Sequence, residues 1–409
     1  MRRGKGLGIR LGVRLGILLG VLLGGAVVPV RAHAQDAKSA WAAYVRAFDG
    51  FVAAESIVGG STVLMRDGKV VAHREVGFGD RALGQRVDGN TIFHWGSITK
   101  TLTAIAVMQL VERGKLSLDA RVTDYIPELR RVHDPYGSMD SITVQMLLSH
   151  ASGLQGPTWP WTEDKPWQPF EPTTWEQLVA MMPYQELAFK PGSRFSYSNP
   201  GFVYLARIVE QITGDPWEAY VQKNIFAPLG ITRSYFNGTP YYLAADRSNN
   251  YYVTKDSAGR VGVTANGRDF DPGITIPNGG WNAPLSDMVT YLAFITDATG
   301  GDTAKRRLYD TVLPHRTLTA MWVARYPTAV DAPTADSMAT SFFISHRGAV
   351  RLVGHTGTQA GFRSFVSWDP ATRIAVIASF NTIDLVDNTA YERGFTAVRT
   401  AAADAIIAH

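Results

Sequence analysis

The chain has 409 residues, of which 45% are hydrophobic, 11% aromatic and 19% charged; this composition excludes a disordered chain and is ample for one large domain or two lobes. Six of the 40 basic residues and none of the 36 acidic residues lie within positions 1–34. The formal charge of +4 therefore becomes −2 beyond them (34 basic against 36 acidic), which excludes a basic excess for nucleic acid. The absence of cysteine excludes disulfides, a cysteine nucleophile and thiolate metal sites.

The first 34 residues are typical of a signal peptide. A basic start precedes an apolar run over Leu15–Val28 that is short for a membrane span, and Ala32-His33-Ala34 forms a small-x-small cleavage site. We expect export to the periplasm or the medium, cleavage before Gln35, one domain over 35–409 and no stable membrane span after cleavage. The alternative is an uncleaved membrane anchor.

Apolar periodicity and turn residues predict the elements of the remaining chain. In chain order we expect a helix over 41–52, a hairpin over 61–76 around an Asp67-Gly68 turn, helices over 97–113, 141–148, 174–181, 199–213, 217–225 and 285–297, strands over 341–346, 351–356, 362–369 and 373–381, and a closing helix over 388–407. Residues 155–173 form a Trp- and Pro-rich loop that either packs on the surface or lines a cleft, and residues 241–279 an irregular or partly stranded insertion.

Strands are thus expected at both ends of the sequence, with mostly helices between them. This order predicts an α/β (α+β) fold, in which N- and C-terminal strands form one antiparallel sheet flanked by helices and an all-helical lobe is inserted. We place the α/β lobe at about 35–90 and 285–409 and the helical lobe at about 91–284.

The first candidate site lies at the start of a predicted helix, where Ser97 and Lys100 are three positions apart. Residues at this spacing share one helix face, with Cβ atoms about 5–6 Å apart. Lys100 is the only charged residue between Thr91 and Val111. Burial and the positive helix N-terminus both lower a lysine pKa, which would make Lys100 a base for Ser97. The alternative is an N-cap serine followed by a lysine whose end reaches solvent.

The second candidate is Tyr197-Ser198-Asn199, which follows a Pro-Gly turn and opens a helix. A tyrosine hydroxyl can relay a proton if a nearby cation lowers its pKa, and an asparagine amide can bind a substrate carbonyl. The alternative is that Ser198 or Asn199 only caps the helix.

The third candidate is Gly354-His355-Thr356-Gly357-Thr358, on a predicted strand after an apolar run. Glycines in a strand allow another backbone to approach closely, and the Thr358 N–H could join the Ser97 N–H in binding an oxyanion. The alternative for His355 is a hydrogen-bonded structural histidine.

In this order and spacing, the three elements resemble the serine β-lactamase and DD-peptidase family, whose signature combines Ser-x-x-Lys, a second polar triplet and Lys-Thr-Gly. The class C-like branch, which uses Tyr-x-Asn, is the most similar. Three further segments fit it: Ile142–Leu154, which contains Leu-Leu-Ser-His-Ala-Ser-Gly-Leu, Lys190-Pro191-Gly192 and Pro228–Thr232. The resemblance runs from about Phe51 to Asn381 and implies a β-lactamase/transpeptidase-like fold.

The resemblance also implies a role for each motif residue. Ser97 would be the acylated nucleophile, Lys100 the base or its electrostatic support, and Tyr197 the proton relay; which of Lys100 and Tyr197 takes the serine proton is left open. Asn199 would contact the substrate amide, and the backbone N–H groups of Ser97 and Thr358 would form the oxyanion hole. The expected catalytic residues are Ser97, Lys100, Tyr197 and His355, and the expected substrate-binding residues are Asn199, Thr356, Gly357 and Thr358. No cofactor or metal is expected.

One departure shifts the expected substrate. His355 stands where β-lactamases usually have lysine, and a histidine is mostly neutral near pH 7. His-Thr-Gly-Thr is similar to the motif of some DD-carboxypeptidases, in which the threonines help to hold a terminal carboxylate; this implicates Thr356 and Thr358. We expect an exported serine hydrolase acting on an amide or ester, with a small-molecule or peptide substrate, a cell-wall peptide among the candidates. A DD-carboxypeptidase or D-peptidase comes first, a carboxylesterase second and a β-lactamase third, with a non-catalytic penicillin-binding or sensor protein as the alternative.

The remaining polar residues near these motifs are given structural roles. His150 and Ser152 are expected in a turn after a helix. Arg347, Arg351 and Arg363 flank the third motif and could meet an anion, but solvation at the surface is the favoured interpretation for each.

Overall fold

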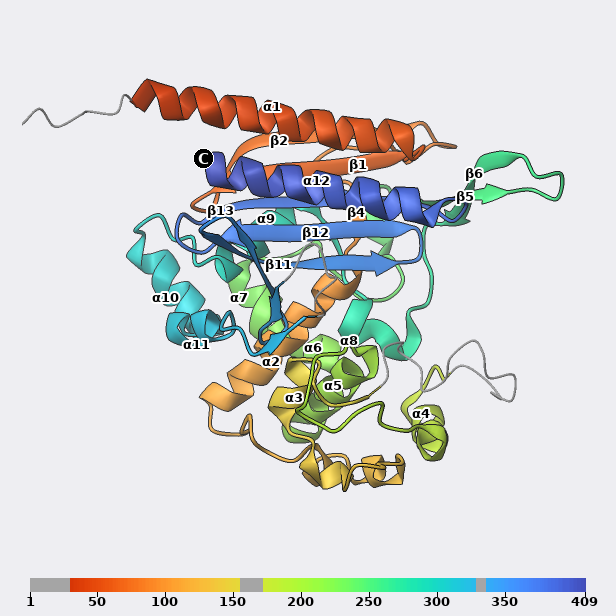
Figure 1. Cartoon of the computed structure of the whole chain (residues 1–409), viewed down its shortest axis with the longest axis vertical. Helices are drawn as coiled ribbons and strands as arrows, with labels where there is room; N and C mark the ends of the chain where they lie inside the picture. Colours follow the sequence, from red (N-terminus) through yellow and green to blue (C-terminus); the bar gives the residue numbers. More distant parts are fainter. Residues whose placement is uncertain (1–29, 155–171, 329–335) are drawn as a thin grey trace, which may run out of the picture.

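A nine-stranded antiparallel sheet organises the fold and joins strands from the two ends of the sequence (Figure 1). The structure, a computed structural model, describes residues 30–154, 172–328 and 336–409. The strand order is β3-β2-β1-β13-β12-β11-β10-β9-β8. The strands are β1 (Gly59–Arg66), β2 (Lys69–Asp80), β3 (Gln85–Arg86), β8 (Tyr326–Pro327), β9 (Ser337–Met338), β10 (Phe343–Arg347), β11 (Val350–Gln359), β12 (Phe362–Asp369) and β13 (Ile374–Phe380).

The hairpin of β1 and β2 begins the sheet, and its turn follows from two residues. Asp67 and Gly68 have φ values of +47° and +78°, the left-handed conformation that a two-residue hairpin turn requires. β1 then pairs with β13, with Val63 opposite Ile377. The predicted hairpin and the predicted union of terminal strands in one antiparallel sheet are therefore confirmed.

Two helices from opposite ends of the chain, α1 (Val30–Ala54) and α12 (Asn388–Ala408), cover one face of the sheet (Figure 1). Aromatic rings fill the layer beneath them: Phe51 lies 5.2 Å from Phe380 and 5.1 Å from Tyr391 between ring centroids. Each buried ring contributes about 1.5–3 kcal/mol to stability. The predicted helix over 41–52 is confirmed, although α1 begins at Val30, so the expected cleavage site lies in its first turns.

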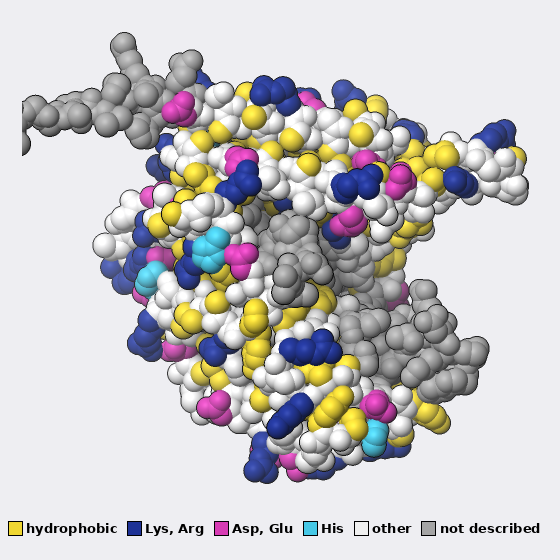
Figure 2. All heavy atoms as spheres, in the orientation of Figure 1, with side chains coloured by type: hydrophobic (Ala, Val, Ile, Leu, Met, Phe, Trp, Pro, Cys, Tyr) yellow, Lys and Arg dark blue, Asp and Glu magenta, His cyan; other side chains and the backbone are white. Residues whose placement is uncertain are grey.

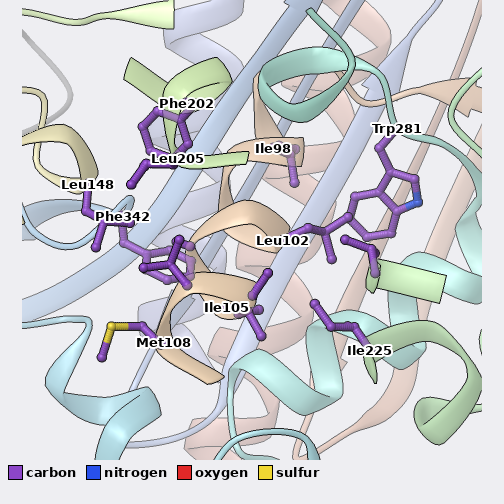
Figure 3. Close-up of a cluster of buried hydrophobic side chains, with 14 of the residues drawn as sticks. Ile98, Leu102, Ile105, Met108, Leu148, Phe202, Leu205, Ile225, Trp281 and Phe342 are labelled. Carbon is purple, nitrogen blue, oxygen red and sulfur yellow. The ribbon is translucent and has the colours of Figure 1, made fainter. Parts of the chain in front are cut away.

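The other face of the sheet is covered by helices gathered around α2 (Thr99–Glu112), which is buried from Thr99 to Leu110. Figure 3 shows Leu102 and Ile105 of α2 among side chains from other helices, including Phe202 and Ile225. The surrounding helices are α3 (Val144–Leu148), α4 (Trp175–Met181), α5 (Asn199–Thr213), α6 (Trp217–Val221), α7 (Ala227–Leu229), α8 (Ile276–Gly279), α9 (Leu285–Ile295), α10 (Thr303–Val312) and α11 (His315–Ala320). Because α2 is enclosed on all sides, its N-terminus has a defined place beneath the sheet.

Two smaller sheets complete the fold. β4 (Ile92–His94) pairs with β7 (Asn282–Pro284), and β5 (Asn250–Lys255) pairs with β6 (Val261–Gly267) and with β14 (Thr382–Asp384). The first pair holds the chain directly before the Ser97 segment, since β4 ends two residues before Gly96. The two lobes placed at 35–90 with 285–409 and at 91–284 stay a prediction.

The described surface is mixed in charge. Figure 2 shows basic and acidic side chains interspersed on this face of the molecule, without a continuous area of one sign. Within residues 30–154, 172–328 and 336–409, no helix combines the length and apolar character needed to cross a bilayer.

Candidate active site

Ser97 lies in a short 3-10 helix, η1 (Gly96–Ile98), that leads into α2 and packs against β11. Two glycines permit this approach. A Cβ on Gly96 would lie 2.6 Å from the Thr358 nitrogen, and one on Gly357 would lie 1.9 Å from the Trp95 carbonyl oxygen. Both distances are far below a van der Waals contact, so neither position accepts a side chain without a shift of the backbone. The close approach places Ser97 and Thr358 in the lining of the same two pockets.

Lys100 occupies the first turn of α2 directly beneath Ser97. Its Nζ lies 3.0 Å from Ser97 Oγ and donates to the Asn278 carbonyl oxygen at 2.8 Å. The ammonium position is also 4.9 Å from the centroid of the Tyr197 ring. Burial lowers the pKa of Lys100 well below the usual lysine value, as the sequence predicted, so that a neutral amine can stand beside the hydroxyl. The sequence did not predict the hydrogen bond from Lys100 to the Asn278 carbonyl oxygen, because no local pattern links two residues so far apart in the chain.

Tyr197 is positioned by the start of α5. Ser198 caps this helix by accepting from the Gly201 N–H at 3.2 Å, and the tyrosine precedes the cap. Burial raises the pKa of Tyr197, and a hydrogen bond with Ser97 offsets only part of this effect. Lys100 does not act as a cation that lowers the pKa of Tyr197, because burial also pushes this amine toward its neutral form. Tyr197 is therefore a neutral phenol that can donate its proton.

His150 supports Tyr197 from behind. The two rings are stacked, with centroids 4.2 Å apart and planes 24° apart, and His150 Nδ1 accepts from the Ser198 N–H at 2.9 Å. Burial, followed by the effect of Lys100, lowers the pKa of His150 well below its usual value. The sequence interpretation placed His150 in a turn and did not foresee this contact. Ser152 does lie in that turn, where its hydroxyl accepts from the Leu154 N–H at 3.4 Å.

His355 lies on β11, is 3% exposed, and its Nδ1 donates to the Thr356 carbonyl oxygen at 2.6 Å. Its ring is tilted against Phe343 at 5.3 Å and against Tyr197 at 6.4 Å between centroids. Burial, followed by the nearby Lys100, lowers the pKa of His355 to about 3. The imidazole is therefore neutral and cannot supply the positive charge of a lysine at this position. Its contacts fit the structural interpretation of His355, and its expected catalytic role stays a prediction.

Asn199 and Thr358 are placed beside Ser97, as expected. The Asn199 amide oxygen is buried and has no hydrogen-bond partner among the described residues, so it is available to a substrate donor. Thr358 Oγ1 accepts from Arg363, which pairs with Glu392 at 2.7 Å. The expectation that Arg363 is solvated is wrong: its side chain is 16% exposed, because it packs between β11 and α12. Thr358 is thereby linked to the helix on the far face of the sheet.

The two other arginines near the third motif lie at the surface. Arg347 pairs with Asp404 at 2.8 Å, with half of each side chain exposed, and Arg351 is exposed.

Two pockets meet at Ser97. The first, called the polar cleft here, has a volume of about 450 Å³ and is lined by Ser97, Pro172, Thr173, Asn199, Asp271, Pro272, Gly273, Thr275, Asn278, Gly279, Thr358 and Gln359. The second, called the aromatic pocket, has a volume of about 430 Å³ and is lined by Ser97, Phe195, Tyr197, Thr328, Phe343, Thr356 and Thr358. Of the loop expected over 155–173, only its last two residues are described, and both line the polar cleft. The two pockets bring five of the eight expected site residues to the surface of one cavity, while Lys100, His355 and Gly357 are not among its lining residues.

Comparison with known proteins defines the class. The family model called Beta-lactamase matches residues 45–397, so the chain belongs to the Beta-lactamase family, a family of serine hydrolases. Among curated relatives, Esterase EstB of Burkholderia gladioli is 33% identical over 208 residues, which cover 49% of this chain and 52% of EstB. The match thus spans about half the length of that relative.

Solved structures show the same fold. The octameric penicillin-binding protein homologue from Pyrococcus abyssi superposes with a TM-score of 0.68 at 26% identity, covering 83% of this chain and 73% of that chain. A class C β-lactamase superposes with a TM-score of 0.69 at 20% identity, covering 90% of this chain and 96% of that chain. The predicted family and the β-lactamase/transpeptidase-like fold are both confirmed.

Proposed function

We propose that this family member hydrolyses an amide or ester through an acyl-enzyme formed on Ser97. The observation that carries the proposal is the pair of Ser97 Oγ and Lys100 Nζ, 3.0 Å apart, in which burial lowers the pKa of the amine. A neutral amine at hydrogen-bonding distance is the base that a weakly acidic serine hydroxyl needs to become a nucleophile.

The geometry supports the following steps. The Ser97 hydroxyl gives its proton to Lys100 Nζ while its oxygen bonds to the substrate carbonyl carbon. The carbonyl oxygen becomes an oxyanion, which the backbone N–H groups of Ser97 and Thr358 stabilise. When the bond to the leaving group breaks, the proton held by Lys100 passes to the leaving atom through the Tyr197 hydroxyl. Water then attacks the acyl-enzyme and releases the acid, with the same groups moving the proton back to Ser97.

For the substrate, we propose a peptide of the DD-carboxypeptidase or D-peptidase type, with a cell-wall peptide as the candidate partner. The support is the His-Thr-Gly-Thr motif, whose Thr356 and Thr358 line the aromatic pocket beside Ser97. A carboxylesterase is the second candidate, supported by the 33% identity to Esterase EstB. A β-lactamase is third, because the buried neutral His355 replaces the charged lysine usual in that class.

Covalent labelling of Ser97 tests the proposal. The purified protein is mixed separately with a fluorophosphonate, a penicillin and a p-nitrophenyl ester, and adducts are followed by intact-protein mass spectrometry together with product release. We expect one adduct on Ser97, absent in Ser97→Ala and retained in Ser193→Ala, a control in which an exposed serine is removed. Turnover of penicillin would identify a lactamase and turnover of the ester an esterase; consumption of neither would favour the peptidase.

Two results would overturn the proposal. Labelling of Ser97→Ala at the rate of the natural chain would remove Ser97 as the nucleophile. Absence of every adduct, on protein that unfolds cooperatively, would mean that the site is catalytically idle, and a non-catalytic penicillin-binding or sensor role would replace the hydrolase.

We also propose that the chain is exported and matures near Gln35. The support is the basic, apolar and small-residue pattern of residues 1–34. The mass of the protein recovered from the periplasm or the medium should correspond to a chain that begins near Gln35. A chain that keeps these 34 residues in a membrane fraction would show an anchor instead.

A further inference from the structure

The two pockets share Ser97 and Thr358 and otherwise differ in every described lining residue. A carbonyl held over Ser97, with its oxygen at the Ser97 and Thr358 N–H groups, therefore has one substituent directed into each pocket. One pocket must receive the acyl part of the substrate and the other the leaving group. This step rests on the proposed function, because it takes Ser97 as the nucleophile.

The proton relay identifies which pocket holds the leaving group. The leaving atom needs a proton as its bond to the carbonyl carbon breaks, so the acid that supplies it must border the leaving-group side. Tyr197 forms part of the aromatic pocket and is absent from the lining of the polar cleft, whereas Asn199 lines only the polar cleft. Lys100 borders neither pocket, so Tyr197 is the group that faces the leaving atom.

Three rings line the aromatic pocket, and Phe343 is paired with each of the other two. Phe343 lies 6.2 Å from Phe195 in an edge-to-face arrangement and 6.4 Å from Tyr197 with planes only 9° apart. Behind Phe343 stands His355, which burial keeps neutral. Among the described residues of this pocket none is charged, and its polar groups are hydroxyls. Such a surface favours a flat apolar group.

The polar cleft has the opposite character. The amide oxygens of Asn199 and Asn278 are buried without partners among the described residues, and the Asp271 carboxylate also borders the cleft. No lysine or arginine is among its described lining residues. Acceptors of this kind suit the N–H groups of an acylated amino acid rather than a ring.

We infer that the aromatic pocket is the leaving-group subsite and that it selects leaving groups carrying a phenyl-sized ring. The substrate class is then an acylated D-amino acid joined to an aromatic amine-side residue or to an aromatic alcohol, with the peptide N–H groups of the acyl part in the polar cleft. A leaving residue with a carboxylate remains compatible, since the Thr356 and Thr358 hydroxyls at the edge of the pocket can donate to it.

Two matched substrate pairs test this inference. The first pair is N-acetyl-D-alanyl-D-phenylalanine and N-acetyl-D-alanyl-D-alanine; the second is the benzyl and ethyl esters of N-acetyl-D-alanine. Within each pair the acyl-enzyme is the same, so deacylation is common and the ratio of kcat/KM values reports leaving-group binding and acylation alone. In whichever pair is turned over, we expect the ring-bearing member to be preferred about tenfold or more, the factor that corresponds to burial of one ring.

Three variants test whether the preference for the ring-bearing substrate arises in the aromatic pocket. Phe343→Ala should bring the ratio close to one, and Phe195→Leu, which keeps an apolar side chain in the pocket wall, should reduce the ratio. Asp271→Asn, in the polar cleft, is the matched control. The Gly273 N–H donates to the Asp271 carboxylate at 2.7 Å, and asparagine keeps a side-chain oxygen for this hydrogen bond. This variant should leave the ratio unchanged, whatever it does to overall activity.

The outcomes separate this inference from the proposed function. If Ser97 is acylated and the ring-bearing members have no advantage, or if Phe343→Ala and Phe195→Leu both keep the full ratio, the leaving-group assignment is wrong and the hydrolase proposal stands. If neither pair is hydrolysed and no ester labels Ser97, both proposals are wrong.

Discussion

Substitution of Gly357 by alanine tests whether the close approach of β11 to the Ser97 segment controls catalysis. The new Cβ would lie 1.9 Å from the Trp95 carbonyl oxygen and 2.5 Å from Ser364 Oγ. A carbon–oxygen contact needs about 3.3 Å, so β11 and η1 must separate by about 1.4 Å. The shift moves the Thr358 N–H away from the oxyanion, and a displacement of about 1 Å at a reacting centre costs about 100-fold in rate.

We therefore expect Gly357→Ala to lower kcat/KM for the best ester or peptide about 100-fold, and the free energy of unfolding by about 1–3 kcal/mol through overpacking. The assays are steady-state hydrolysis and urea unfolding followed by circular dichroism. Gly50→Ala is the matched control, because its Cβ meets nothing within 4 Å; alanine there should raise stability by up to about 1 kcal/mol and leave kcat/KM unchanged. A Gly357→Ala protein that folds and keeps kcat/KM within about threefold of the natural value would refute the reasoning.

Three further predictions concern the buried titratable groups. Lys100→Met should lower kcat/KM about 100- to 10,000-fold, because it removes the base. It should not lower the thermal midpoint, because it replaces a buried amine by an apolar chain. A loss of kcat/KM below tenfold would contradict the role of Lys100 as the base. In the natural chain, kcat/KM should rise once with increasing pH, with a midpoint well below the usual lysine pKa, because only the neutral amine of Lys100 accepts the proton. A rise with its midpoint near pH 10 would contradict the effect of burial on the pKa of Lys100. Burial lowers the pKa of His94 to about 4 and of His355 to about 3, so the unfolded chain binds more protons between these values and about 6.5. The free energy of unfolding should therefore fall as the pH drops from about 6.5, by about 1.4 kcal/mol per pH unit for each histidine, and equal urea midpoints at pH 7 and pH 5 would contradict it.

The elements that local physics defines were predictable from the sequence. Asp67-Gly68 takes the positive φ values that a two-residue hairpin demands, and Gly114 ends the helix begun at Thr99, with φ of +65°. Apolar-rich runs bounded by turn residues placed β11, β12 and β13 within a few residues of their observed bounds. The charged helix α10, with Lys305 among its basic residues, was not predicted, because its sequence is mostly polar and only Tyr309 and Val312 are buried.

The order of the three motifs identified the family, and the comparison with known proteins confirmed it. The spacing of Ser97 and Lys100 also predicted their contact, because three positions on one helix leave side chains on the same face. The contact between Ser97 and Lys100 follows from a short stretch of chain, and the family follows from the order of such stretches. Folding changes neither of them.

The electrostatic state of the site and its supporting contacts were decided by the tertiary structure alone. The raised pKa of Tyr197, the stack of His150 on its ring, the Asn278 carbonyl on Lys100 and the burial of Arg363 all depend on segments that are distant in sequence. Desolvation depends on everything packed around a group, and no local pattern encodes that enclosure. For the same reason, the two pockets that flank Ser97, and with them the side on which the leaving group departs, emerge only when strands, helices and loops are brought together.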